Sequence, residues 1–152
     1  MTRVLILTAG FGEGHNAAAR NLSAAIAARA GPGTADVADL FALASPAADR
    51  LARRLYLLLI NRAPRLWNGF YGWVDRSPVL PRHLWLFRPQ LRALAALLAR
   101  GRPDVVCSTY PVYGFIAARL AAKGLLTAPH HLVVTDSISI NSLWTQIGRA
   151  HV

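Results

Sequence analysis

The residues best suited to chemistry stand together near the start of the chain, in a glycine-rich loop. Glycines occur at every second position, at Gly10, Gly12 and Gly14, and His15 and Asn16 follow them directly. Backbone amides in such a loop, and the positive end of a helix that begins there, bind anions such as phosphate. The same helix end disfavours an imidazolium. We therefore expect His15 to be neutral near pH 7 and able to take a proton from a sugar or glycerol hydroxyl.

Two further polar residues, Tyr110 and Asp136, each follow an apolar run that we interpret as a strand. In open α/β sheets, ligands bind at the carboxyl ends of parallel strands, so we expect both residues to lie at the edge that carries the glycine loop. Asp136 either caps the loop after its strand or orients His15 or an acceptor. His130 and His131 lack a cysteine or carboxylate at ligand spacing, so no metal site is predicted.

The glycine loop also invites comparison with nucleotide-binding motifs. A dinucleotide fingerprint has glycines at its first, third and sixth positions. Gly10 and Gly12 fit this spacing, and Asp36 or Asp39 lies at the right distance to hold a ribose, but the sixth position is His15. A P-loop is excluded because no Lys followed by Ser or Thr comes after the last glycine. A plain strand-to-helix turn is the remaining alternative, although it needs only one or two glycines.

Strands and helices alternate around these residues. Short apolar runs, rich in β-branched residues, predict strands at 4–7, 34–41, 104–108 and 130–136, and the second of these is expected to end near Asp39. Helices are predicted at 17–30, 49–62, 89–100 and 115–123, where apolar residues recur at helical spacing or alanines dominate. Strand, helix and strand joined by short connections form a parallel sheet. The predicted fold is therefore α/β, a Rossmann-like parallel sheet with flanking helices.

Residues 47–99 differ from the rest of the chain, because arginines and aromatic side chains gather there. The residues singled out are Arg50, Arg53, Arg54, Trp67, Phe70, Tyr71 and Trp73. Three interpretations remain open: core helices with solvated arginines, a membrane-interface surface, and a surface on which single-stranded nucleic acid stacks. The membrane interpretation rests on the preference of Trp and Tyr for the interface and of Arg for anionic headgroups.

Composition narrows the classes of partner and compartment. The chain has 152 residues with 17 basic against 7 acidic side chains, a net charge of +10, which favours an anionic partner such as nucleic acid, anionic lipid or a phosphorylated substrate. Its single cysteine, Cys107, excludes an intrachain disulfide and is interpreted as a buried bystander. No apolar run approaches the roughly 18 residues that span a bilayer, and the start of the chain lacks the features of a signal peptide.

Three segments together resemble one known family. Residues 7–19, with the glycine loop, are similar to the opening of the monogalactosyldiacylglycerol synthase and processive diacylglycerol glucosyltransferase family. Residues 102–111 resemble its segment in which Pro-Asp and two apolar residues precede an aromatic residue and Pro. Residues 133–137, with Trp144 eight residues after Asp136, resemble its segment of Val-Thr-Asp and a later Trp. The three segments occur in order and span nearly the whole chain.

The resemblance implies a GT-B glycosyltransferase built from two Rossmann-like domains. The N-terminal domain of such an enzyme binds the membrane and the lipid acceptor, and the C-terminal domain binds a UDP-sugar, which serves as co-substrate without a further cofactor. The function implied is transfer of a hexose to diacylglycerol or a similar membrane lipid, as in glycolipid biosynthesis. Its partners would be the lipid acceptor and an anionic phospholipid surface, on the cytoplasmic, inner face of the cell membrane.

The resemblance also assigns roles to residues. His15 corresponds to the base that deprotonates the acceptor hydroxyl, with Asp136 as a second catalytic residue. Gly12, Gly14 and Asn16 belong to the loop that faces the donor phosphates. Tyr110 and Pro111 belong to the acceptor-binding segment. Many family members carry a histidine a few residues after the Thr-Asp pair, and residues 137–141 contain none, so no role for that histidine is carried over.

The same comparison sets the expected domain organisation. Residues 1–145 would form an incomplete N-terminal acceptor domain, a truncated half of a GT-B fold. Residues 146–152 resemble a non-native tail, and the UDP-sugar domain would be absent. We then expect the isolated chain to be inactive. The alternative from another functional class is a nucleotide-binding or nucleic-acid-binding Rossmann-like module, which the resemblance disfavours.

Overall fold

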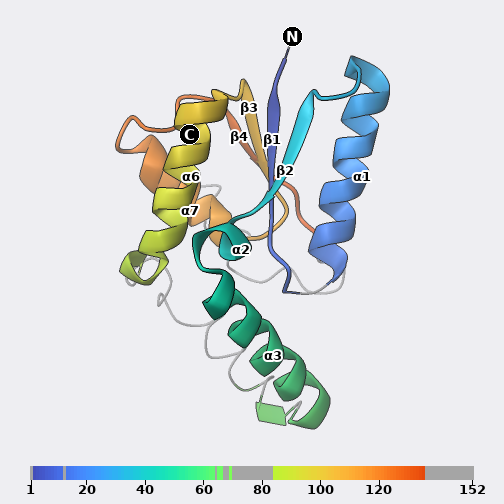
Figure 1. Cartoon of the computed structure of the whole chain (residues 1–152), viewed down its shortest axis with the longest axis vertical. Coiled ribbons are helices and arrows are strands. Elements are labelled where there is room, and N and C mark those ends of the chain that lie inside the picture. Colours follow the sequence, from blue (N-terminus) through green and yellow to red (C-terminus); the bar gives the residue numbers. More distant parts are fainter. Residues whose placement is uncertain (1, 12, 64, 67–68, 70–83, 136–152) are drawn as a thin grey trace.

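The computed structural model describes residues 2–11, 13–63, 65–66, 69 and 84–135. The strands are β1 (Val4–Thr8), β2 (Ala35–Asp39), β3 (Val105–Ser108) and β4 (His130–Leu132). The helices are α1 (Glu13–Ala30), α2 (Leu40–Ala44), α3 (Pro46–Arg62), the 3-10 turn η1 (Leu84–Phe87), α6 (Arg88–Gly101) and α7 (Val112–Ala121). Figure 1 shows the strands side by side between the helices.

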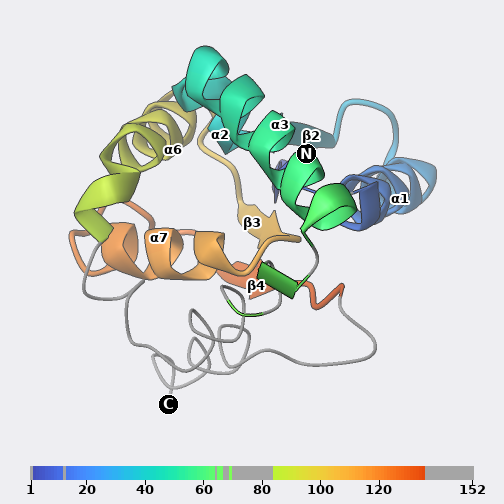
Figure 2. The ribbon, with the colours of Figure 1, turned by 90° about the horizontal axis from the view of Figure 1, so that it is seen from below.

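The four strands form one parallel sheet in the order β2-β1-β3-β4. The register pairs Val4 with Ala35 on one side and with Val105 on the other. Helix α1 covers one face of the sheet, and α6 and α7 cover the other (Figures 1 and 2). The predicted α/β class with a parallel sheet is therefore confirmed.

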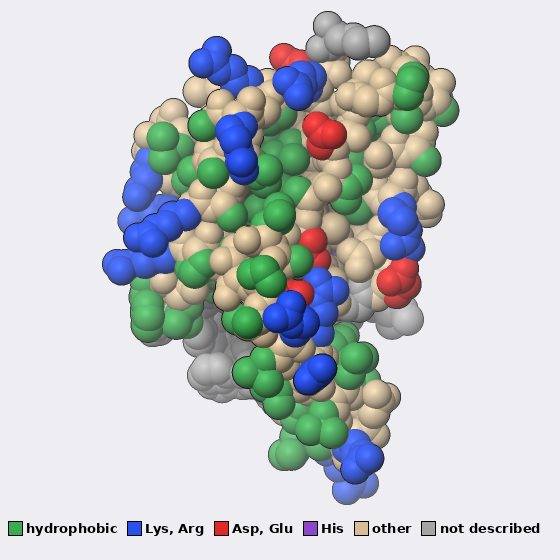
Figure 3. Space-filling view, in the orientation of Figure 1, with side chains coloured by type: hydrophobic (Ala, Val, Ile, Leu, Met, Phe, Trp, Pro, Cys, Tyr) green, Lys and Arg blue, Asp and Glu red, His purple; other side chains and the backbone are tan. Residues whose placement is uncertain are grey.

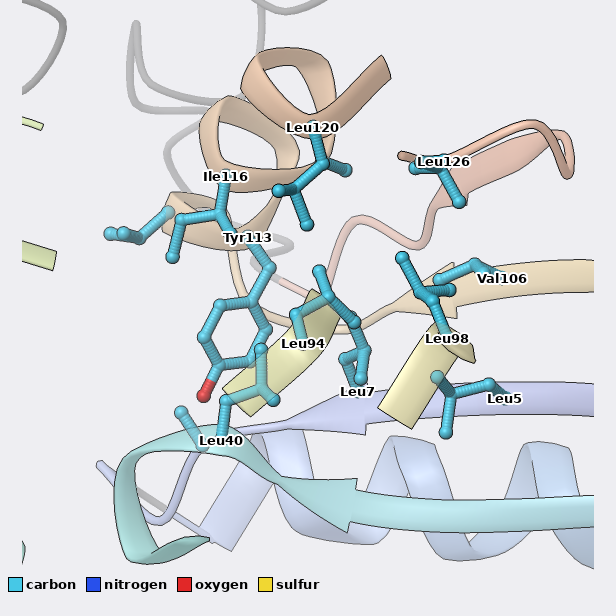
Figure 4. Packing of buried hydrophobic residues seen from close by; sticks show 13 residues of the cluster. Leu5, Leu7, Leu40, Leu94, Leu98, Val106, Tyr113, Ile116, Leu120 and Leu126 are labelled. Atoms are coloured by element: carbon cyan, nitrogen blue, oxygen red, sulfur yellow. The ribbon is translucent and has the colours of Figure 1, made fainter. Parts of the chain in front are cut away.

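The core follows from the two-residue period of the central strand. Leu5 and Leu7 point toward α6 and α7, whereas Ile6 points toward α1. On the first face, Leu94 and Tyr113 are fully buried and pack against Leu7 (Figure 4). This layer is the larger of the two clusters, so the face covered by α6 and α7 contributes most of the apolar burial.

Several elements differ from the sequence prediction at the edge where the strands end. Helix α1 begins at Glu13 rather than near 17, so His15 lies inside its first turn. The second strand, by contrast, stops at Asp39 as expected, because its side chain accepts hydrogen bonds from the amides of Phe41 and Ala42 and thereby starts α2. Helix α7 begins at Val112, where the sequence suggested a turn. Strand β4 ends at Leu132 rather than near Asp136.

Helix α3 leaves the body of the molecule at this same edge. It begins at Pro46, which occupies the first turn as proline prefers, and extends beyond the carboxyl ends of the strands (Figure 1). Most of the helix extends past the edge of the sheet and therefore does not pack against a strand. The first half of the helix nevertheless contacts the rest of the protein, at α2 and at Gly10.

Candidate functional site

Buried hydroxyl groups at the carboxyl ends of β1 and β3 hold the start of α1. The Thr8 hydroxyl donates to the side-chain oxygen of Asn16 over 2.9 Å. The fully buried Thr109 donates to the backbone carbonyl of His15 over 3.1 Å. The Tyr113 hydroxyl donates to the carbonyl of Thr8 over 2.9 Å. The bonds from Thr8 and Thr109 therefore tie the first turn of α1 to the ends of β1 and β3, and the bond from Tyr113 joins α7 to the end of β1.

His15 is half-buried at this edge, between residues of two distant segments. Its Nδ1 lies 2.8 Å from the hydroxyl oxygen of Thr135, which follows β4. Its ring lies edge-on to Tyr110, with 5.1 Å between ring centroids. The segments after β1, β3 and β4 therefore meet at the imidazole, and the contacts with Thr135 and Tyr110 help to orient its ring.

The partner seen at His15 is the neighbour of the one considered from sequence. Asp136 was the candidate to orient His15, and it lies outside the described residues. Thr135, directly before it, makes the contact. The sequence contains a signal for this role, because Thr135 is the middle residue of the Val-Thr-Asp segment.

Gly14 lies in the first turn of α1, where backbone amides have no acceptor within the helix. Its φ is not positive, and a methyl group built on it would meet nothing within 4 Å. Neither packing nor backbone conformation within the described residues therefore requires glycine there. Asn16 uses its side-chain oxygen to accept from Thr8, so that oxygen is part of the anchoring of α1. Gly12 lies outside the described residues.

An aromatic cluster lies beneath the loop. Phe11 stacks on Tyr110 at 6.1 Å and meets Phe41 edge-on at 5.0 Å. Tyr110 in turn contacts Tyr113 at 5.5 Å, and Pro111 beside it is buried. Burial raises the pKa of Tyr113 far above its ordinary value, and the negative charge of Asp39 acts in the same direction. The cluster presents a rigid apolar wall beside His15.

Arg53 differs from its predicted role at a membrane surface. Its guanidinium donates to Asp39 and to Asp49, each over 2.7 Å, and to the carbonyl of Gly10 over 3.2 Å. The sequence pattern showed only an arginine on the polar side of a helix, because Asp39 and Gly10 are distant in the chain. Asp39 is equally occupied, since it also accepts from the Gly10 amide, so its carboxylate is not available to bind a ribose.

The outer surface of α3 combines exposed leucines with exposed arginines (Figure 3). Leu51, Leu55, Leu57 and Leu58 each expose half or more of their surface. Arg50 and Arg54 are exposed between them. None of the described helices is long and apolar enough to cross a membrane. Trp67, Phe70, Tyr71 and Trp73, which were expected at the same surface, lie outside the described residues.

Two grooves of the protein lie away from this site. One of about 590 Å³ runs between β2 and α6, beside Val37, Leu43 and Leu97, and another of about 510 Å³ adjoins Leu125. Neither groove is lined by His15 or Tyr110, so the candidate site is defined by its polar side chains and not by a groove. Among the described residues, no three His, Cys, Asp or Glu side chains gather as metal ligands. Cys107 is buried, as expected, and burial raises the pKa of its thiol.

Most of the chain matches the model of one protein family. Residues 15–150 match the family model of monogalactosyldiacylglycerol (MGDG) synthase. The chain belongs to the MGDG synthase family. The matched segment begins at His15 and contains Tyr110 and Thr135, the two residues described above in contact with the imidazole. The resemblance seen in the three sequence segments is thereby confirmed.

Curated relatives of this MGDG synthase family chain carry a common name. A processive diacylglycerol beta-glucosyltransferase of Bacillus cytotoxicus is 29% identical over 142 residues. Proteins of the same name from Bacillus thuringiensis (strain Al Hakam) and Bacillus cereus (strain AH187) are 28% identical over 142 residues. The alignments cover 93% of this chain and 36% of each relative, so the chain spans about a third of their length. No solved structure matches the chain.

Proposed function

We propose that the whole protein is a glycosyltransferase that transfers a hexose from a UDP-sugar to diacylglycerol or a similar membrane lipid. This chain supplies the acceptor side of the site and the base. The observation that carries the proposal is the position of His15, in the first turn of α1 at the carboxyl edge of the sheet, held between Thr135 and Tyr110 in an MGDG synthase family chain. The chain alone is expected to be inactive.

In the proposed reaction, the acceptor hydroxyl attacks the anomeric carbon of the donor sugar. A bond forms between that carbon and the acceptor oxygen, and the bond from the same carbon to the UDP oxygen breaks, with inversion at the carbon. His15 takes the hydroxyl proton as the new bond forms. The departing diphosphate gains negative charge, which the orphan amides and positive end of α1 stabilise near Gly14. Asp136 stays a candidate for a second catalytic role.

The contact with Thr135 sets a condition on the base. An imidazole that accepts a proton at Nε2 must carry its own proton on Nδ1. Thr135 then accepts a hydrogen bond from Nδ1 and holds the ring in that tautomer, over the observed 2.8 Å. Nitrogen-15 NMR of His15 measures the tautomer directly. Protonation at Nε2 in the neutral ring would contradict the assignment of His15 as base.

Substitution of Gly14 distinguishes a donor-binding role of this residue from a purely structural one. Replacing it by alanine stabilises α1 by about 0.5–1 kcal/mol, because alanine is the better helix former and the added methyl group has open space. In the proposed site the same methyl group faces the donor diphosphate and lowers transfer. A Gly14→Ala variant that is more stable and fully active would contradict the donor role, and urea unfolding with a transfer assay measures both.

The exposed surface of α3 is proposed to dock on an anionic membrane, which places the protein peripherally on the inner face of the cell membrane. Leu51, Leu55 and Leu58 would enter the interface, with Arg50 and Arg54 against anionic headgroups. This arrangement suits an acceptor that stays in the bilayer. It also agrees with the net charge of +10.

Co-sedimentation with phosphatidylglycerol vesicles tests this surface on the 152-residue chain. Leu55→Asp should weaken binding at least about tenfold, because a leucine side chain gains about 1.5–3 kcal/mol on burial. Leu125→Asp, an equally exposed leucine beyond α7, is the matched control and should leave binding unchanged. Arg54→Gln should cost about fivefold, since each arginine near an anionic surface contributes about 1 kcal/mol. Preference for single-stranded DNA without vesicle binding would overturn the docking proposal.

Transfer itself is tested in a segment exchange. The matched 142 residues replace the corresponding segment of the Bacillus cytotoxicus relative, and glucose transfer from UDP-glucose to diacylglycerol is measured. The proposal predicts transfer by the hybrid enzyme and none by the 152-residue chain alone. A hybrid that folds, binds vesicles and transfers no sugar would refute the proposed function, as would transfer by the chain on its own.

A further inference from the structure

A closed ring of hydrogen bonds joins α3 to the glycine loop. Arg53 donates through Nη1 to the carbonyl of Gly10 over 3.2 Å and through Nη2 to Asp39 over 2.7 Å. The same oxygen of Asp39 accepts from the Gly10 amide over 3.0 Å. Both polar groups of the Gly10 backbone are therefore held by one arginine–aspartate pair. The loop between β1 and α1 is fixed by a residue that lies 43 positions away in the chain.

Arg53 forms ion pairs with Asp39 in this ring and with Asp49 beside it, and both pairs are partly withdrawn from solvent. The side chains of Arg53, Asp39 and Asp49 are 32%, 21% and 6% exposed. Burial alone lowers the pKa of Arg53, but hydrogen bonds and charges from Asp49 and Asp39 outweigh it, so the net shift is upward. The second oxygen of Asp49 is buried and has no hydrogen-bond partner among the residues that the structure describes. Removal of Arg53 would leave a buried carboxylate uncompensated, which is more costly than the loss of a surface pair.

Glycine at position 10 leaves room for the guanidinium of this arginine, which would have to move if a side chain were introduced there. A Cβ built on Gly10 would lie 1.5 Å from Nη1 of Arg53 and 1.9 Å from its central guanidinium carbon. The guanidinium therefore rests directly against the Gly10 backbone, in the space that any side chain would fill. Gly10 does not have a positive φ, so its reason for being glycine is this close approach rather than backbone conformation.

Helix α3 also contacts the glycine loop through aromatic rings. Tyr56, one turn beyond Arg53 on α3, meets Phe11 edge-on at 6.2 Å. Phe11 stacks on Tyr110 at 6.1 Å, and Tyr110 lies against His15 at 5.1 Å. Helix α3 thus touches the loop at two successive residues, by charge at Gly10 and by packing at Phe11. Phe11 and Tyr110 thus connect Tyr56 with the imidazole of His15 through successive ring contacts.

We infer that Arg53 is a positioning residue, which fixes the glycine loop and ties the orientation of α3 to the position of His15. The structural half of this inference concerns the chain itself. The catalytic half rests on the proposed function, because it requires that His15 acts in sugar transfer. Contact of α3 with a membrane would then act on the same unit that carries the base.

Amide hydrogen exchange of residues 8–14 in the 152-residue chain tests the structural half. Arg53→Gln removes the bonds to Gly10 and Asp39 and should speed exchange in this peptide about tenfold, the effect of losing one hydrogen bond to a charged donor. The circular dichroism spectrum of Arg53→Gln should match that of wild type, which shows that the fold is intact even though the free energy of unfolding falls. Arg54→Gln, an exposed arginine on the same helix, is the control and should leave the loop unchanged. Unchanged loop exchange in Arg53→Gln would overturn the inference.

The hybrid glucosyltransferase tests the catalytic half. Arg53→Gln should lower kcat about tenfold with little change in KM for diacylglycerol. Arg53→Lys keeps the positive charge but lacks the paired N–H donors of the guanidinium, so it should recover part of the lost kcat. Faster loop exchange with an unchanged kcat would reduce Arg53 to a structural residue and overturn this half. If the wild-type hybrid transfers no sugar, the proposed function fails, and loop exchange still decides whether Arg53 positions the loop.

Discussion

Asp39→Asn is the substitution whose cost is most directly worked out from the structure. One oxygen of Asp39 accepts from the amides of Phe41 and Ala42, at 3.0 and 3.1 Å, and caps α2. The other accepts from the Gly10 amide at 3.0 Å and from Arg53 at 2.7 Å. Asparagine has a single oxygen. If it keeps the cap, its NH₂ group faces two donors, and if it turns, the cap is lost.

The expected cost follows from two lost hydrogen bonds to one carboxylate oxygen. A hydrogen bond to a charged group contributes about 1.5–3 kcal/mol. Since Asp39 and Arg53 keep some exposure, the low end of this range applies to each bond, and the free energy of unfolding should fall by about 3 kcal/mol. Asp39→Ala removes the remaining cap as well and should cost about 1 kcal/mol more.

Urea unfolding followed by circular dichroism measures these differences. Asp36→Asn, an exposed carboxylate on the same strand, is the matched control and should change stability by no more than about 0.5 kcal/mol. The expected order of destabilisation is Asp39→Ala, then Asp39→Asn, then Asp36→Asn. An Asp39→Asn protein as stable as the Asp36→Asn control would refute the reasoning, because the ring at Gly10 would then contribute nothing to the fold.

Two further predictions concern the core. Leu94→Ala removes a fully buried side chain between α6 and the sheet and should cost about 2–5 kcal/mol in urea unfolding, whereas a loss below about 1 kcal/mol would contradict the packing. Tyr113→Phe should cost about 1 kcal/mol at neutral pH, because the hydroxyl no longer donates to the Thr8 carbonyl. The raised pKa of Tyr113 means that the folded state keeps this proton where the unfolded state loses it, so stability is full below about pH 10 and falls by up to about 1.4 kcal/mol per pH unit above it. Urea unfolding at several alkaline pH values should show this part of the decline in wild type and not in Tyr113→Phe, and equal slopes would contradict it.

The local pattern of the sequence predicts the sheet well. Residues 4–7 are continuously apolar because β1 lies at the centre of a sheet that is covered on both faces, and the order of strands and helices follows from short connections. The ends of elements are predicted less well. Helix α1 begins at Glu13 rather than near 17, where Thr109, 94 positions away in the chain, holds its first turn, and β4 ends at Leu132 rather than near Asp136.

The candidate site divides in the same way. His15 is recognisable because an imidazole after alternate glycines is unusual, and Tyr110 because it follows a strand at the ligand edge. Thr135 and Arg53 escape such reasoning, since their partners lie 120 and 43 positions away. Only the fold brings these residues together, and it turns an arginine predicted to face lipid into one that holds the loop.

The central claim is that His15 is the base for sugar transfer, and its removal from the hybrid enzyme tests the claim most directly. His15→Ala should lower kcat by about 10²–10⁴-fold, the range expected for loss of a general base. Urea stability and vesicle binding of the 152-residue variant should stay close to wild type, because the anchoring bond at this position comes from the backbone carbonyl of His15. A folded His15→Ala hybrid that retains wild-type kcat would contradict the account.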